Sequence, residues 1–268
     1  AGNEIDLDEE GSRIVISSIF DKKEYKTSVF ELNKLPSELT HEFIVSLYKS
    51  GVKDVELKNS NLKQRKEIKE ILNSTLGLEV MGLDKEKLNL LDLGTCSEES
   101  LLKAEQQIYW RLLFMIERLL DLKSTKEEIK EIDSEINRLC FYIERNIATK
   151  FSSSSKNFLF YEKVSLLENA GDFLRSLKIY SKDLSKLKEI LEVISQLIEL
   201  FRKQPKTLEE FSELKEFLNK LKLSVEKLQK SKDNSLALAT ILVYKNLKQL
   251  FDVCFTLNLG KIFDESNI

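Results

Sequence analysis

Apolar residues recur three and four positions apart through most of the chain after residue 95, and this pattern constrains the fold more than any other feature. Leucine and isoleucine keep the spacing from Leu101 to Leu120. Residues spaced in this way share one face of an α-helix, so the pattern predicts helices that bury an apolar stripe. Two prolines and eight glycines in 268 residues also favour long helices over many short strands. The sequence therefore predicts a mostly helical protein.

Breaks in this periodicity divide the C-terminal part into six long antiparallel helices. Ser124 and Glu127 have the spacing of a capping box, in which a hydroxyl and a carboxylate satisfy free amides at a helix start. Further breaks fall at FSSSSKN (151–157), at Pro205 and at SKDN (231–234). Six such helices in succession predict a helical bundle.

The helical part also contains an internal repeat. A shift of 80 residues (252 minus 172) places Asp172 on Asp252 and brings apolar positions of the two halves into register. A repeat of this length predicts two units of three helices each. We expect these units to span residues 96–181 and 182–268.

Before residue 95, short strand-like runs alternate with helical ones in the order β-α-β-α-β-β. The strand-like runs are TSVFEL (27–32), KDVEL (53–57), GLEVMGL (77–83) and KLNLLDL (87–93). Two helices on one antiparallel sheet predict a small split α/β domain of the ferredoxin-like kind over residues 19–95. The expected fold class is α+β, mostly α, with this domain followed by the two three-helix repeats.

Two carboxylates stand inside an apolar helical run, VSLLENAGDFLRSLKIY (164–180). Glu168 and Asp172 lie four residues apart, so they share a helix face and can reach one cation. Hard oxygen ligands of this kind suit Mg, Mn, Ca or Fe, especially when a neighbouring helix adds carboxylates. The preceding helix offers Glu131, Asp133 and Glu135. The alternative is a solvated helix face, because this spacing also arises by chance in highly charged helices.

The motif LLENAGDFLRSL resembles the third-helix motif of the PhoU family of phosphate-uptake regulators, in which an E-x-x-x-D pair sits in an apolar helix. IKEIDSEINRLCFYI (129–143) resembles the second-helix motif of that family, and the two three-helix repeats resemble its fold. The segment 41–81 resembles the α/β segment that precedes the helices in archaeal PhoU-like proteins.

The resemblance implies a metal site in the first repeat that holds a divalent or ferric ion. Its implied ligands are Asp133, Glu168 and Asp172. Asn137 and Asp252 are weaker candidates, because Asn137 is neutral where the family has an acid. Lys248 stands four residues before Asp252, where the family has a glutamate, and its charge would repel a metal unless it pairs with Asp252.

The first 18 residues, AGNEIDLDEEGSRIVISS, resemble the second half of an AbrB-type DNA-binding domain, ending in a hairpin. Such a domain needs both halves and a basic face, whereas this remnant is acidic. We expect DNA binding only if a missing N-terminal half is restored. The whole chain adds no argument for a polyanion partner, because 42 basic residues nearly balance 45 acidic ones.

Other candidate sites are weak. His41 is the only histidine, which excludes a histidine-based triad, and it is expected at the surface of a helix. Three widely separated cysteines indicate neither disulfides nor a zinc site, and Cys140 and Cys254 are expected in the core. Trp110 and its aromatic neighbours are expected to pack, with a partner groove as the alternative. No apolar run is long enough for membrane insertion.

The sequence therefore predicts a cytoplasmic, non-enzymatic regulator of phosphate uptake or phosphate-responsive transcription. It is expected to form a homodimer and to bind protein partners such as phosphate transporter or sensor components. One alternative is a helical scaffold protein that has kept the fold without metal. The other is a transcription factor whose DNA-binding half is missing from this chain.

Overall fold

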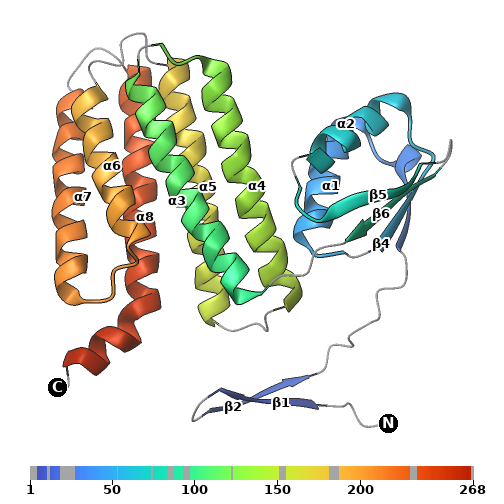
Figure 1. Ribbon diagram of the computed structural model, residues 1–268, viewed down its shortest axis with the longest axis horizontal. Helices are drawn as coiled ribbons and strands as arrows, with labels where there is room; N and C mark the ends of the chain where they lie inside the picture. Colours follow the sequence, from blue (N-terminus) through green and yellow to red (C-terminus); the bar gives the residue numbers. More distant parts are fainter. Residues whose placement is uncertain are drawn as a thin grey trace. The chain divides into compact units, whose positions relative to one another are not determined.

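The computed structural model confirms an α+β protein that is mostly α (Figure 1). The residues it describes are 5–10, 13–18, 28–52, 54–73, 75–83, 87–92, 97–121, 123–150, 155–180, 187–229 and 234–266. The chain divides into two compact units. The α/β unit comprises Ala1–Leu47, Val52–Glu70 and Gly77–Gly94, and the helical unit comprises Tyr48–Gly51, Ile71–Leu76 and Thr95–Ile268.

The α/β unit is built on a four-stranded sheet with strand order β3-β4-β6-β5. Its elements are β3 (Ser28–Glu31), α1 (Thr40–Lys49), β4 (Asp54–Lys58), α2 (Leu62–Asn73), β5 (Leu78–Leu83) and β6 (Lys87–Asp92). The last residues of α1, from Tyr48, and of α2, from Ile71, belong to the helical unit. Alternate residues of β4 and β6 are buried, among them Val55, Leu57 and Leu88, as expected for strands with one face on a core. Ile44 of α1 and Ile68 of α2 are fully buried in the same unit.

The sheet is mixed, which corrects the expectation of an antiparallel, ferredoxin-like sheet. β3 and β4 pair in parallel, with Val29 opposite Glu56, while β4 and β5 each pair antiparallel to β6. The chain passes from β3 to β4 through α1, and a helical crossover of this kind delivers the next strand in parallel. The ferredoxin-like order also splits its βαβ units, whereas β3 and β4 are direct neighbours here.

A separate hairpin lies near the N-terminus. β1 (Ile5–Glu10) pairs antiparallel with β2 (Arg13–Ser18), from Ile5 opposite Ser18 to Glu10 opposite Arg13. The strand pairing agrees with the hairpin expected within residues 1–18. Its relation to an AbrB-type domain stays a prediction.

The helical unit consists of two consecutive groups of three helices around one apolar core, which extends from Leu101 to Ile262. The helices are α3 (Glu98–Leu120), α4 (Lys126–Lys150), α5 (Ser155–Tyr180), α6 (Lys188–Arg202), α7 (Leu208–Gln229) and α8 (Asn234–Ser266). Within the groups, α3 packs against α4 and α5, and α7 against α6 and α8. The groups meet where α3 contacts α6 and α5 contacts α8 (Figure 1).

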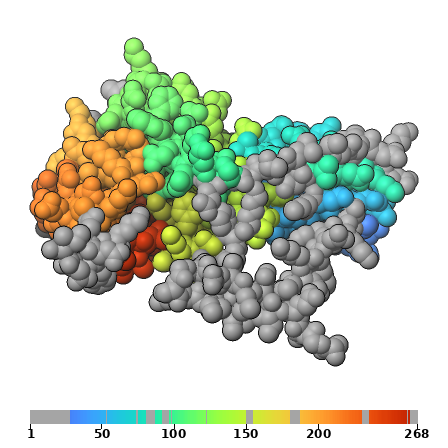
Figure 2. All heavy atoms as spheres, turned by 60° about the horizontal axis from the view of Figure 1, so that its bottom comes forward, coloured from blue at the N-terminus to red at the C-terminus, as the bar shows by residue number. Residues whose placement is uncertain are grey.

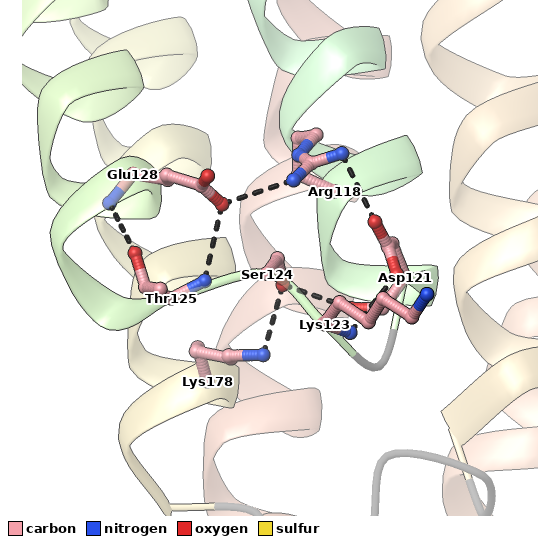
Figure 3. Close-up of polar contacts among 7 residues, drawn as sticks. All are labelled: Arg118, Asp121, Lys123, Ser124, Thr125, Glu128 and Lys178. Atoms are coloured by element: carbon pink, nitrogen blue, oxygen red, sulfur yellow. Dashed lines mark hydrogen bonds and ion pairs between the residues drawn. The ribbon is translucent and has the colours of Figure 1, made fainter.

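The capping box of α4 lies one residue later than expected from Ser124 and Glu127. The Thr125 hydroxyl accepts a hydrogen bond from the Glu128 amide at 3.1 Å, and Glu128 Oε2 accepts one from the Thr125 amide at 3.1 Å (Figure 3). The helix begins at Lys126, and the capping hydroxyl must stand just before the first helical residue. The displacement by one residue follows from this requirement.

Ser124 instead ties the turn between α3 and α4 to α5. Its hydroxyl donates to the Asp121 carbonyl and accepts a hydrogen bond from Lys178 Nζ, both at 2.9 Å. Arg118 joins the same turn by binding Asp121 and Glu128 at 3.0 Å each (Figure 3). These contacts hold the turn between α3 and α4 against α5 and against the start of α4.

Gly51 is a position in the helical unit that only glycine fits. Its φ is +76°, in the left-handed region, and an added Cβ would stand 1.8 Å from Thr149 Cγ2. Thr149 cannot turn away freely, because it is β-branched and its hydroxyl donates to the Arg145 carbonyl at 3.0 Å. We expect Gly51→Ala to lower the free energy of unfolding by about 2 kcal/mol, from backbone strain and this overlap.

Gly260 of α8 provides the matched control, because an added Cβ there meets nothing within 4 Å. Gly260→Ala is expected to raise the free energy of unfolding by about 0.5–1 kcal/mol, since alanine loses less entropy in a helix. Both variants can be compared by urea unfolding. The fluorescence of Trp110, the single tryptophan of the chain, reports on the helical unit. Equal effects of the two substitutions would contradict the role assigned to Gly51.

Candidate functional site

The candidate site lies along α5, which packs against α3, α4 and α8. Because neighbours cover this helix on several sides, its polar side chains are taken out of water and need partners. Glu168 and Asp172 are four residues apart on α5, a spacing that places them on one face of the helix. Each of them meets a side-chain cation of the same unit.

Asp133 of α4 and Asp172 share one arginine. Arg175 Nη1 donates to Asp133 Oδ2 at 2.5 Å, and its Nη2 lies 3.3 Å from Asp172 Oδ1. The Asp133 side chain is only 1% exposed, whereas Asp172 and Arg175 reach the surface. We call these three residues the arginine cluster. It neutralises a buried carboxylate with a guanidinium held at the edge of the unit.

A second cluster lies further along the same two helices. Lys49 Nζ is 2.8 Å from Glu144 Oε2 of α4 and 3.8 Å from Glu168 Oε2. Lys49 belongs to the helical unit together with its neighbours Tyr48–Gly51, and its Nζ also lies 4.1 Å from the centre of the Phe141 ring. We call Lys49, Glu144 and Glu168 the lysine cluster. Glu144, like Asp133, is only 1% exposed.

Burial weakens the acidity of these carboxyl groups. It raises the pKa of Asp133 to about 6, although Arg175 acts in the opposite direction. It raises the pKa of Glu168 to about 7 against the pull of Lys49, and it also raises the pKa of Glu144. Acids with pKa values near neutrality and named charge partners are candidates for functional residues.

The three predicted metal ligands do not come together as one ligand set. Asp133 and Asp172 meet at Arg175, while Glu168 turns to Lys49. Within the described part of the chain, no three or more His, Cys, Asp or Glu side chains are grouped so that they could hold a metal ion. A bound metal at these residues stays a prediction, which the metal content of the purified protein tests.

The weaker candidates also lie apart from a common site. Asp252 is exposed on α8, as is Lys248. Asn137 is half-buried on α4, one turn after Asp133. The Asn137 Oδ1 and Asp133 Oδ1 atoms accept no hydrogen bond from the described residues. These two oxygens are acceptors without a hydrogen-bond donor among the described residues near the predicted site.

Sequence reasoning missed a buried ion pair between α3 and α5. Lys163 Nζ lies 2.5 Å from Glu105 Oε1, and the two side chains are 10% and 1% exposed. Burial acts to lower the pKa of Lys163, but the acidic groups around it, including Glu105, raise it overall. The fully buried Tyr109 ring lies 5.9 Å from Nζ. The signal was present, because both charged residues fall on the apolar stripes of their helices.

The outer side of α3 exposes apolar side chains. Leu102, Trp110 and Phe114 are 50%, 49% and 43% exposed, and we call them the α3 apolar face. Arg202 of α6 lies 4.4 Å from the centre of the Trp110 ring, so one edge of this face is cationic. In Figure 2 the green surface of α3 adjoins the yellow-orange surface of α6. The expectation that these aromatic side chains pack is confirmed for Tyr109, which is fully buried, and is wrong for Trp110 and Phe114.

The predicted positions of the single histidine and of two cysteines can be compared with the structure. His41 is exposed on α1, and Cys140 and Cys254 are buried in the helical core, which confirms their predicted positions. Cys96 lies outside the described residues. Among the helices of the described part, none combines the length and apolar character needed to cross a membrane.

Comparison with known proteins adds no relative. No family model, no curated protein and no solved structure matches this chain.

Proposed function

We propose that this chain is a non-enzymatic regulator that controls phosphate uptake or phosphate-responsive transcription by binding protein partners. The observation that carries the proposal is the α3 apolar face. Its three large apolar side chains are about half exposed, and Trp110 and Phe114 stand one helical turn apart. Neighbouring exposed apolar groups of this kind mark interaction sites when they form a contiguous patch. The PhoU-like motifs on α4 and α5 supply the link to phosphate.

The clusters on α4 and α5 favour binding over catalysis. Their carboxylates are each paired with Lys49 or Arg175. An acid that already holds a cationic partner serves to fix the position of helices. We infer that the clusters keep α4 and α5 rigid, so that the outer surface of the bundle is presented to a partner in one shape.

The proposed partners are components of a phosphate transporter or sensor, met in the cytoplasm, with the regulator itself as a homodimer. Aromatic side chains beside an arginine are the composition that protein interfaces favour. Trp110, Phe114 and Arg202 provide it on one side of the helical unit.

The test combines gene deletion with one charged substitution. Deletion in the native host is expected to change uptake of radiolabelled phosphate, and the wild-type gene to restore it. Phe114→Glu is expected to fail, because a charge placed in an apolar contact weakens binding by about thirty-fold. Leu223→Glu places the same charge on an exposed leucine of α7 and is expected to restore uptake like wild type.

Each failure has a separate meaning. If deletion leaves phosphate uptake and phosphate-responsive transcripts unchanged, the link to phosphate is wrong and the scaffold alternative takes its place. If Phe114→Glu restores uptake as well as Leu223→Glu does, the partner binds elsewhere. Circular dichroism of both purified variants shows that they remain folded.

A further inference from the structure

We propose that Arg175 and Lys49 are built-in counter-cations, which hold the four carboxylates of the arginine and lysine clusters together in place of a metal ion. The inference concerns the helices themselves and does not depend on the proposed regulation of phosphate. It makes the helical unit independent of metal supply.

The geometry of Arg175 is that of a cation bridging two helices. It stands three residues after Asp172 on α5, and its two terminal nitrogens each meet a different carboxylate, Asp172 on its own helix and Asp133 on α4. A guanidinium is planar, permanently charged and able to donate in several directions. One side chain thereby does what a shared metal ion would do, joining oxygens from neighbouring helices.

Lys49 has the same role at the second cluster. Its ammonium group lies within 4.0 Å of both Glu144 on α4 and Glu168 on α5. Lysine is a compact point charge with three donors, so it can serve two carboxylates together. Each cluster thus contains one cation and two acids, one acid from α4 and one from α5.

Burial explains why a cation is needed at both places. Asp133 and Glu144 are each only 1% exposed, and an isolated buried carboxylate is strongly unfavourable. With the guanidinium in contact with both Asp133 and Asp172, a divalent ion would have to displace a positive charge to reach them. Each buried acid of the two clusters is thus paired with a cation of the chain itself.

The second three-helix group supports this pairing of acid with cation. The residue 80 positions after Arg175 is Phe255, whose ring meets the Phe211 ring edge-on at 5.0 Å. The acid 80 positions after Asp172 is Asp252, which is exposed on α8, so it needs no cation to offset its burial. Arg175 is therefore present in the first three-helix group, which has the buried Asp133, and in the second group the aromatic ring of Phe255 stands at the equivalent position.

The experiment uses the full 268-residue chain, purified without chelator or affinity tag. We expect substoichiometric metal by mass spectrometry and the same melting temperature in EDTA and in Mn²⁺. Arg175→Gln is expected to lower the melting temperature by about 5 °C, because Asp133 loses its partner. Arg175→Lys keeps a charge and is expected to lose less. Arg138→Gln, on the exposed face of α4, is the control without effect.

Adding Asp133→Asn to Arg175→Gln distinguishes a counter-cation from a packing residue. The double variant is expected to recover most of the lost melting temperature, because the buried charge is then gone. Strictly additive losses would overturn the proposal. Stoichiometric metal in the wild type, with a fall in melting temperature when EDTA removes it, would also overturn it.

Discussion

Replacing Lys163 with Met is expected to lower the free energy of unfolding of the helical unit by about 3–5 kcal/mol, the largest single effect in this chain. The substitution leaves Glu105 buried without its partner, and breaking one side of a buried ion pair typically has this cost. Urea unfolding followed by Trp110 fluorescence measures the loss. Trp110 lies five residues from Glu105 on the same helix, so the signal reports on the affected region.

The control variants distinguish the loss of the buried ion pair from the loss of a lysine as such. Lys156→Met makes the same change on an exposed turn of α5 and is expected to alter the free energy by less than about 0.5 kcal/mol. Combining Lys163→Met with Glu105→Leu removes both charges and is expected to return the stability close to that of wild type. If the double variant is as unstable as Lys163→Met alone, the pair is not the source of the loss.

The helices could be predicted because each one carries its own apolar stripe. In α5, for example, Leu167, Ala170, Leu174 and Leu177 follow the helical spacing and are all buried. Their boundaries were less certain, since they depend on single capping contacts. Thr125 and Ser124 are neighbours of similar chemistry, and only the start of α4 at Lys126 decides which one caps it.

The direction of strand pairing could not be predicted in the same way. The alternation in β4 identifies a strand with one buried face, and it is the same for a parallel or an antiparallel neighbour. The wrong expectation came from treating the whole sheet as antiparallel. Passage through α1 between β3 and β4 was the better guide, because a crossover connection favours parallel strands.

The side-chain contacts of the candidate site, like the direction of strand pairing, could be predicted only in part. Helical spacing placed Glu168 and Asp172 on one face, and Asp133 of α4 is joined to Asp172 through Arg175. Spacing indicates Arg175 as a partner for Asp172, three residues before it on α5, but it cannot indicate the contact of Lys49 with Glu168. Lys49 precedes Glu168 by more than one hundred residues, and its place in the helical unit is a property of the fold alone.

A pH-dependent stability is the second large effect, and Glu168 is one of its sources. Burial holds its pKa at about 7, against an ordinary value of 4.5, with Lys49 and Glu144 as its nearest charged groups. Asp133 and Asp172 add negative charge from α4 and α5. Between these two pKa values the folded state binds more protons than the unfolded state, so stability falls as pH rises.

Glu168→Gln is expected to remove the part of this dependence that Glu168 contributes, because glutamine resembles the protonated acid at every pH, while Asp133, with a pKa of about 6, keeps its own part. At pH 8 the variant is expected to be more stable than wild type by about 2–3 kcal/mol, and near pH 4 the two are expected to be alike. Urea unfolding at pH 4, 6 and 8, followed by Trp110 fluorescence, measures the difference. Glu131→Gln, on the exposed face of α4, controls for the loss of one carboxylate. An unchanged slope in Glu168→Gln would mean that this carboxyl is ionised throughout, with Lys49 neutralising it fully.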